Sequence, residues 1–138
     1  MPREPEIETA LVCDDVRREQ SGKDILIGVY TGGIGVPALP SQPLLAFWLA
    51  LRAREPGEFL LSLQIIVSKT ARAKMSMNLE LPPNAETSFL HDPFAVFVPP
   101  VPLLIEAPGD LELQARWGER GKFRTLLRKP IVLIPPTP

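Results

Sequence analysis

The stretch Cys13-Asp-Asp-Val-Arg-Arg-Glu-Gln-Ser-Gly-Lys-Asp-Ile-Leu-Ile-Gly-Val-Tyr30 decides the fold, because its parts constrain one another. A charged run is followed by the turn residues Ser21 and Gly22 and then by an apolar, β-prone run, an order typical of a β-hairpin. A strict two-residue turn would set Glu19 opposite Asp24, and like charges in opposed positions destabilise a sheet. We therefore predict a hairpin with a longer turn.

The strand that precedes this hairpin is expected over about residues 6–13. Val16 falls out of register with Leu11 and Cys13, so a bulge at Asp14-Asp15 would be needed to return it to the core. The longer turn would also leave Glu19 free to reach Lys23. Turn and register therefore account for the residues of the hairpin without a functional role.

Composition limits the size, compartment and partners of the protein. The chain has 138 residues, 45% of them hydrophobic, and a net charge of -1. It fits one domain over residues 1–138 with short flexible ends at 1–5 and 135–138, and it has no field to draw nucleic acid or an anionic membrane. A single cysteine cannot form an internal disulfide, and the start of the chain has no signal-peptide pattern. No apolar run approaches the roughly 20 residues of a membrane helix. We therefore expect a cytoplasmic protein.

Seventeen prolines make long helices improbable and mark where strands stop. The clearest inside/outside alternation covers residues 72–81. Leu44–Leu51 is apolar throughout, as in a strand with both faces covered or a buried helix, and Pro43 before it and Arg-Glu-Pro-Gly after it favour the strand. We predict an all-β, antiparallel two-sheet β-sandwich of immunoglobulin-like or Greek-key type with about eight short strands, and a small barrel as the alternative. The expected strands lie at about residues 6–13, 25–30, 44–51, 59–67, 72–81, 111–117, 123–127 and 131–134. Residues 94–98 and 101–106 are expected to be short strands or two arms of one strand bent at Pro99-Pro100.

A glycine-rich loop is the first candidate for ligand binding. Gly32, Gly33 and Gly35 follow a strand, but prolines come next instead of the helix that a dinucleotide-binding loop requires. A small-ligand or carbohydrate site would use these glycines together with Tyr30 or His91. No cofactor is expected.

The metal and thiol hypotheses depend on four residues of the hairpin. Asp14, Asp15 and Asp24 could come together around calcium, although calcium takes six to eight oxygen ligands and no Asp-x-Asp-x-Asp loop is present. The structural alternative is that one of the adjacent pair caps backbone N–H groups while the other is solvated. Cys13 is expected to be buried and inert; an exposed Cys13 beside arginines would instead be reactive.

His91 is the only histidine. Together with Ser88 and Asp92 it supplies the residue types of a catalytic triad, but residues so close on one loop seldom form the required relay, and no nucleophile elbow is present. One histidine and one cysteine are also too few ligands for zinc. We therefore assign no catalytic or metal residues and expect the protein not to be an enzyme.

Six cationic residues on or beside the expected strands could form a basic patch for nucleic acid. The aromatic residues needed for base stacking fall on core-type positions, so solvated strand charges are the simpler interpretation. The cations concerned are Arg72, Lys74, Arg116, Arg124, Arg128 and Lys129.

The opening of the chain resembles that of a broad family of small, uncharacterised bacterial all-β domains. The matching elements are Cys13–Arg17, the turn Gly22-Lys23 and Ile27–Tyr30, followed by a proline-marked loop. The resemblance covers about the first third of the chain; beyond it only the rhythm of strands is similar. It implies a compact bacterial domain and carries no activity.

Together these observations favour a non-catalytic cytoplasmic domain that acts through protein contact. Self-association along an exposed sheet edge or face, as a possible homodimer, is the first form of this hypothesis, because no catalytic constellation is evident and apolar residues suffice for a patch outside the core. The small-ligand or carbohydrate-binding domain is the alternative. A hydrolase using His91 and Asp92 is a third hypothesis.

Overall fold

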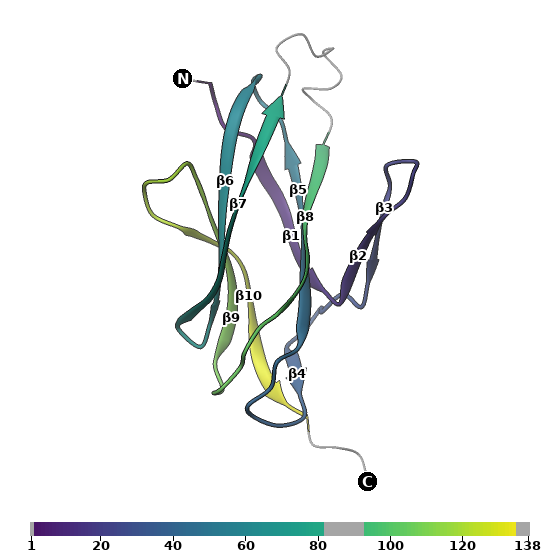
Figure 1. Cartoon of the computed structure of the whole chain (residues 1–138), viewed down its shortest axis with the longest axis vertical. Helices are drawn as coiled ribbons and strands as arrows, with labels where there is room; N and C mark the ends of the chain where they lie inside the picture. The colour runs from purple at the N-terminus through teal and green to yellow at the C-terminus, as the bar shows by residue number, and fades with distance from the viewer. Residues whose placement is uncertain (1, 82–92, 135–138) are drawn as a thin grey trace.

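The computed structural model describes residues 2–81 and 93–134 and is all-β, which confirms the expected class (Figure 1). The described residues form ten strands, where about eight were expected, and none of them forms a helix long and apolar enough to span a bilayer. The strands are β1 (Glu6–Cys13), β2 (Asp15–Arg18), β3 (Asp24–Ile27), β4 (Ile34–Val36), β5 (Leu44–Arg52), β6 (Gly57–Val67), β7 (Thr70–Leu81), β8 (Pro93–Pro102), β9 (Asp110–Trp117) and β10 (Arg124–Leu133).

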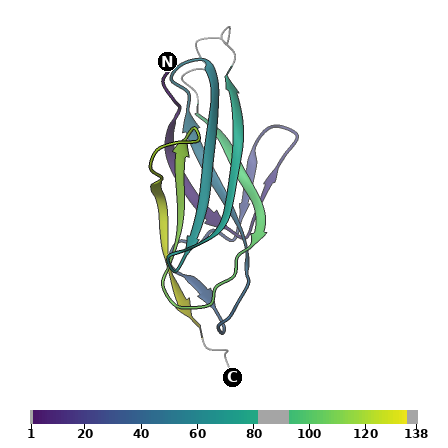
Figure 2. The same cartoon turned by 60° about the vertical axis from the view of Figure 1, so that its left-hand side comes forward.

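The strands form three sheets. A three-stranded sheet has the order β1-β5-β8, a five-stranded sheet has the order β4-β10-β9-β6-β7, and β2 pairs only with β3. All pairings are antiparallel except that of β4 with β10, which is parallel. The expectation of a purely antiparallel arrangement was wrong at this one place. Figures 1 and 2 show the two larger sheets as layers and the β2–β3 hairpin standing outside them.

One core lies between the two larger sheets, because both contribute to the same cluster of buried side chains. In β5, Leu45, Phe47, Leu49 and Leu51 are fully buried in this core. The opposite face of the same strand is also covered, since Ala46 belongs to a second small cluster under the hairpin. The expectation that this strand has both faces covered is confirmed along most of its length, whereas Leu44 at its start is 59% exposed. Cover on both faces accounts for the apolar run from Leu45 onward.

The β6–β7 hairpin follows its predicted alternation, with one correction at the turn. The connection was expected at residues 69–71, but the turn residues are Ser68 and Lys69, both with positive φ, and Thr70 already pairs with Val67. Left-handed conformations at both central positions fit a tight hairpin turn. The register then shifts by one residue between Ile65 and Ile66, which twists the start of β7.

Two strand boundaries differ from the sequence-based expectation, and one open alternative is decided. β8 runs through Pro99 and Pro100 as one strand whose register against β5 shifts at these prolines, which agrees with the expected two arms of one bent strand and suits an edge strand. β10 likewise continues through Pro130, where two separate strands were expected. The segment after Tyr30, expected to be a loop, contains the three-residue strand β4.

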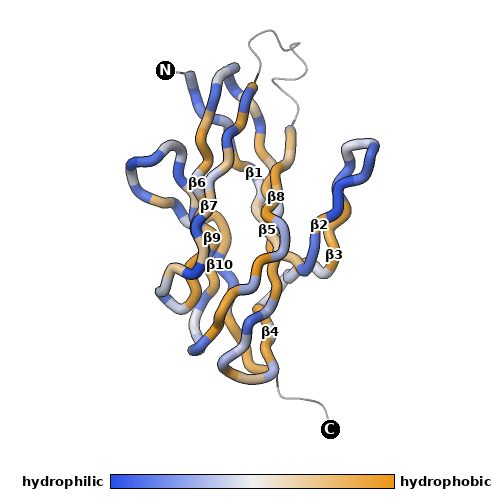
Figure 3. Tube along the Cα trace, in the orientation of Figure 1, coloured by the Kyte–Doolittle hydropathy of each residue, from blue (hydrophilic) through white to orange (hydrophobic). Residues whose placement is uncertain are grey.

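The predicted bulge at Asp14-Asp15 was also wrong, because the chain changes sheet there. β1 ends at Cys13 and β2 begins at Asp15 in a separate two-stranded sheet. Val16 is nevertheless buried, in the small cluster between the hairpin and the outer face of the three-stranded sheet. In Figure 3 the tip of this hairpin is hydrophilic and β3 is hydrophobic.

Candidate functional site

The base of the β2–β3 hairpin is closed by backbone hydrogen bonds and by Asp14. The Asp14 N–H donates to Ile27 O at 2.9 Å, and the Tyr30 N–H donates to Val12 O at 2.9 Å. Gly28 has φ +67°, and a Cβ there would overlap the Asp14 carboxylate. The absent side chain of Gly28 therefore leaves the space that Asp14 occupies.

Tyr30 is half-buried at this base, and its hydroxyl donates to Asp14 Oδ1 at 2.9 Å. Burial first, then the hydrogen bond to Asp14 and the charge of that carboxylate, raises the pKa of Tyr30 to about 12. As a ligand platform Tyr30 would have to offer a ring and hydroxyl free of other partners. The hydroxyl here is engaged within the domain.

Asp15 and Cys13 have structural partners beside this base. Asp15 Oδ1 accepts the N–H of Val16 at 2.8 Å, which agrees with the predicted cap, and Oδ2 lies 3.4 Å from Arg17 Nε. Cys13 is fully buried and free, as expected, and its Sγ donates to Asp15 O at 3.4 Å. Burial raises the pKa of this thiol, which makes it a weak nucleophile.

A polar latch fastens the hairpin to the three-stranded sheet. Arg18 donates to both carboxylate oxygens of Asp24, from Nε at 2.8 Å and from Nη2 at 3.1 Å. The same carboxylate accepts the indole N–H of Trp48 in β5 at 2.9 Å, and Arg18 Nη2 also donates to Ala95 O in β8 at 3.1 Å. The Arg18 guanidinium lies 5.1 Å from the ring centroid of Phe97.

The electrostatics of this latch favour its ionised state. The hydrogen bond from Arg18, and after it that from Trp48, lowers the pKa of Asp24, and Asp24 in turn raises the pKa of Arg18. Asp24 was expected opposite a like charge only if the turn had two residues. The longer turn over residues 19–23 is confirmed, and it pairs Asp24 with Arg18 instead.

The predicted contact of Glu19 with Lys23 is made by the backbone, since the Glu19 N–H donates to Lys23 O at 2.8 Å. The Glu19 carboxylate accepts the hydroxyl of Ser21 at 3.2 Å. The turn is therefore ordered by short-range bonds rather than by an ion pair.

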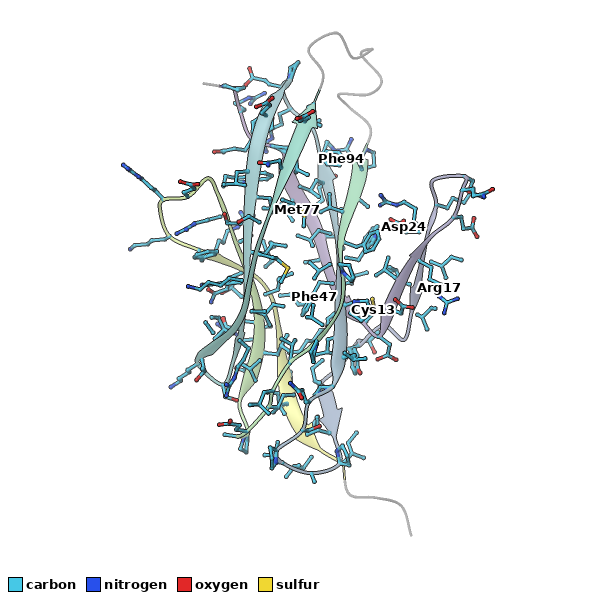
Figure 4. The ribbon with its side chains drawn as sticks, viewed as in Figure 1. Cys13, Arg17, Asp24, Phe47, Met77 and Phe94 are labelled. Carbon is cyan, nitrogen blue, oxygen red and sulfur yellow. The ribbon has the colours of Figure 1, made fainter. Side chains whose placement is uncertain are left out.

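A cleft of about 570 Å³ lies between the hairpin and the outer face of β5 and β8. The latch residues Arg18 and Asp24 form one wall, and Trp48 and Phe94 are among the apolar residues of the other. In Figure 4 Asp24 faces the sheet while Arg17 points away from it. Because the latch groups already satisfy one another, the cleft offers mainly apolar surface.

The outward side of the hairpin carries an aliphatic stripe. Ile25, Ile27 and Val29 are 44%, 40% and 37% exposed, whereas Leu26 packs inward on the small cluster. Exposed aliphatic side chains in a row are a common feature of contact surfaces. The sequence did not reveal this stripe, because all four residues are apolar and alternation in polarity was therefore absent.

The glycine-rich loop lies against β10. A Cβ at Gly33 would come within 2.7 Å of Val132 Cγ2 and 2.9 Å of Pro130 O, and one at Gly35 would overlap Ile134. Gly32 has nothing within 4 Å of the same position. Gly33 and Gly35 thus permit the close approach of β4 to β10, and the ligand role of this loop with Tyr30 stays a prediction.

The other predicted sites are only partly within the described residues. His91, Ser88 and Asp92 lie outside them, so the hydrolase hypothesis stays a prediction. Within residues 2–81 and 93–134 no three His, Cys, Asp or Glu side chains are grouped so that they could hold a metal ion. Asp14, Asp15 and Asp24, proposed together for calcium, each bind a different protein partner.

Among the described residues the two larger sheets have four edge strands. β7 forms one edge of the five-stranded sheet and β4 the other, while β1 and β8 are the edges of the three-stranded sheet. β7 is the longest of the four, with 12 residues. Its outward positions alternate with the partly buried residues Ala73, Met75, Met77 and Leu79.

Comparison with known proteins gives a family without an assigned activity. A search of curated proteins finds no match. The resemblance of the first third of the chain to an uncharacterised family is extended by a match over residues 8–128, which spans nearly all of the described strands. The chain belongs to DUF6941, a family of unknown function.

Proposed function

We propose that the domain is a non-catalytic protein-interaction domain that self-associates through the free edge of β7. An edge strand presents unpaired backbone N–H and C=O groups, and proteins usually protect such edges with prolines, charged side chains such as lysine, bulges, short strands or inward-pointing charges. β7 carries the proposal because it contains no proline and is not short. Its charged residues Lys74 and Glu80 lie on the outward face.

The other edges are blunted. β8 contains four prolines, β4 has three residues, and β1 has an irregular register between Ile7 and Thr9. β7 has neither proline nor glycine, and its only register shift lies near its start. Ala73–Leu81 is thus a regular nine-residue run, since it pairs with Gly57–Ile65 without interruption.

The charges of this run are self-complementary in an antiparallel pair. Its midpoint is Met77, and a two-fold axis there sets Lys74 of one copy opposite Glu80 of the other, twice. Both side chains are on the exposed face of the strand. Opposite charges in such cross-strand positions stabilise a sheet, and identical contacts on both copies are the defining feature of a two-fold dimer.

The inner face of the run is apolar and incompletely covered. In the same register Met75 lies opposite Leu79, and Met77 lies opposite Met77 of the second copy. All three are only partly buried in the single domain, and Figure 4 places Met77 at the core side of β7. Pairing would extend the hydrophobic core from one copy to the next.

Charge reversal tests both the edge and the register. In Glu80→Lys the two Lys–Glu attractions become repulsions, which weakens dimerisation by about 1–2 kcal/mol, roughly tenfold in Kd. Lys74→Glu has the same effect, and the double variant K74E/E80K restores the wild-type Kd. Sedimentation equilibrium across a concentration series measures all four proteins.

Glu119→Lys is the matched control, because it makes the same charge change in the exposed β9–β10 turn. It leaves the Kd unchanged. A wild-type protein that stays monomeric at high micromolar concentration contradicts the proposal. A dimer that both single variants leave intact places the interface elsewhere.

We also propose that the fold is an immunoglobulin-like sandwich and that the protein is cytoplasmic and bacterial. β1, β5 and β8 take the places of strands A, B and E of an immunoglobulin-like sandwich, and β6, β9 and β10 those of C, F and G, with β7 beside C as in variable-type domains. The shared core between the two sheets supports this assignment. A lone, buried thiol suits a reducing cytoplasm, and the resemblance of the opening supports a bacterial source.

A further inference from the structure

We propose that a second site, on the side of the domain away from β7, binds a small organic anion that carries phosphate or carboxylate groups. The site is a cavity of about 450 Å³ between the segment that leads into β1 and the β9–β10 hairpin. Its volume is within the range of small-ligand pockets. β9 and β10 are separated from β7 by β6, so this site is independent of the proposed dimer edge.

The cavity concentrates positive charge in a protein whose net charge is -1. Five cationic side chains line it, against two carboxylates, and one of those carboxylates, Glu6, already binds Arg54 at 3.1 Å. A hollow lined by one sign of charge focuses the field and raises the local concentration of counter-ions. The five cations are Arg54, Arg116, Arg120, Lys122 and Arg124.

Arg116 supplies a fixed donor to this cavity. Its guanidinium lies 4.5 Å from the ring centroid of Phe123, and Nη1 donates to Gly121 O at 3.3 Å. In the described part of the chain two buried arginine Nε atoms have no hydrogen-bond partner, those of Arg72 in β7 and Arg116, and of these two residues Arg116 lines the cavity. A buried N–H without an acceptor is costly, and an anionic ligand is the natural group to satisfy it.

The contrast with the other arginines on the same strands supports a ligand role. Arg128 in β10 binds Glu112 in β9 at 3.0 Å, so the pairing of these strands provides a carboxylate where one is needed. Arg116 and Arg124 have no ion pair among the described residues. They lie at the end of the same hairpin, whose turn brings in Arg120 and Lys122 as further lining cations. The one acidic residue of this turn, Glu119, is exposed and does not line the cavity.

The chemical class of the ligand follows from these donors. Guanidinium groups match the planar or tetrahedral oxygen sets of carboxylate and phosphate, and they bind both through two parallel hydrogen bonds. The half-buried Trp117 in the wall provides an apolar surface for the organic part. The shared chemistry is an oxyanion with at least two negative charges.

Titration of the full-length protein with pyrophosphate and with citrate, followed by backbone amide NMR at low ionic strength, tests the site. We expect saturable shifts confined to residues 4–7, 54 and 115–124 with at least one of the two anions. The stronger of the two distinguishes phosphate from carboxylate ligands. Arg116→Gln weakens that binding by roughly tenfold, as expected for the loss of a charge-assisted hydrogen bond.

Lys122→Gln/Arg124→Gln is the second variant, because both residues are on or beside the exposed turn and their replacement leaves Arg116 on Phe123. It weakens binding to a similar extent even if Arg116→Gln fails to fold. Arg17→Gln, which removes a cation that is 71% exposed on the hairpin, leaves binding unchanged. The absence of saturable shifts with both anions, or equal weakening by Arg17→Gln, overturns the inference.

Discussion

Replacing Asp24 by alanine removes the carboxylate that joins the β2–β3 hairpin to the three-stranded sheet. This side chain is 8% exposed and accepts three hydrogen bonds, two from Arg18 and one from Trp48. A hydrogen bond to a charged group contributes about 1.5–3 kcal/mol when buried. Arg18 is 46% exposed, so solvent reduces its share toward the range of about 0.2–1 kcal/mol measured for exposed pairs.

The indole N–H of Trp48 loses its acceptor at the same time, in a half-buried position, which adds about 1 kcal/mol. We therefore expect Asp24→Ala to lower the free energy of unfolding by about 2 kcal/mol. Because the hairpin forms a separate two-stranded sheet, part of this loss is expected as local opening. Urea denaturation gives the global value, and amide hydrogen exchange over residues 15–27 gives the local one.

Arg17→Ala is the control for this experiment. Arg17 is on the same strand as Arg18 but is 71% exposed, and its ion pair among the described residues is a 3.4 Å contact with Asp15, so we expect a change within about 0.5 kcal/mol. An Asp24→Ala protein whose unfolding free energy and hairpin exchange both match the wild type would refute the latch.

The latch also predicts a dependence of stability on pH. The pKa of Asp24 is lowered in the folded state, mainly by Arg18, so its contribution is present above the ordinary carboxyl pKa of about 3.9. That contribution is lost as the pH falls through the lower pKa of the folded state. Acid titration of stability is therefore shallower in Asp24→Ala than in the wild type, and parallel curves would contradict this assignment.

Three further predictions concern the base of the hairpin. Tyr30 is the only tyrosine, so absorbance near 295 nm reports it alone, and its ionisation is expected near pH 12, with a lower value in Asp14→Asn; a midpoint near 10 in the wild type would contradict its burial. Gly28→Ala combines φ +67° with overlap of the Asp14 carboxylate and is expected to cost at least about 1–2 kcal/mol in chemical denaturation, less in an Asp14→Ala background. Cys13 is expected to react with a thiol reagent only on unfolding, and rapid labelling of the native protein would show that it is accessible.

The all-β class and most strand positions were predictable because prolines and alternation carry local information. Residues 72–81 alternate clearly, and they lie in β7 as expected. The uniformly apolar Leu44–Leu51 correctly predicted a strand covered on both faces, but it could not identify what covers the second face. That cover is the hairpin, which is a tertiary contact without a periodic signal.

The errors arose where pairing between distant segments overrides local signals. Pro130 suggests a break between two strands, at 123–127 and 131–134, yet β10 continues through it while pairing with β9 and β4. Ile34–Val36 is too short to be recognised, and it is a strand only because β10 lies beside it. Likewise, Val16 is out of register with Leu11 and Cys13, which suggested a bulge. In the structure the chain leaves the first sheet after Cys13, and Val16 lies in β2 of another sheet.

The candidate site shows the same division. The structural interpretation of the pair Asp14-Asp15 is correct for Asp15, which caps a backbone N–H. The place of Asp14 beside Gly28 had no signal in the sequence. The link from Asp24 to Trp48 joins residues 24 positions apart and has no sequence signature. In the sequence, the cations of the basic cavity look like separate charges on exposed strands. They line one cavity because the β9–β10 hairpin lies beside the start of β1 in the folded domain.

The closure of the hairpin at its base has a practical consequence for protein engineering. Backbone hydrogen bonds from Asp14 to Ile27 and from Tyr30 to Val12 hold the two ends of the β2–β3 hairpin together. They do not depend on which residues form the tip of the hairpin. The turn at residues 19–23 is exposed throughout. A reporter peptide or fluorophore grafted there would leave both larger sheets intact. The domain could therefore serve as a display scaffold with one variable loop.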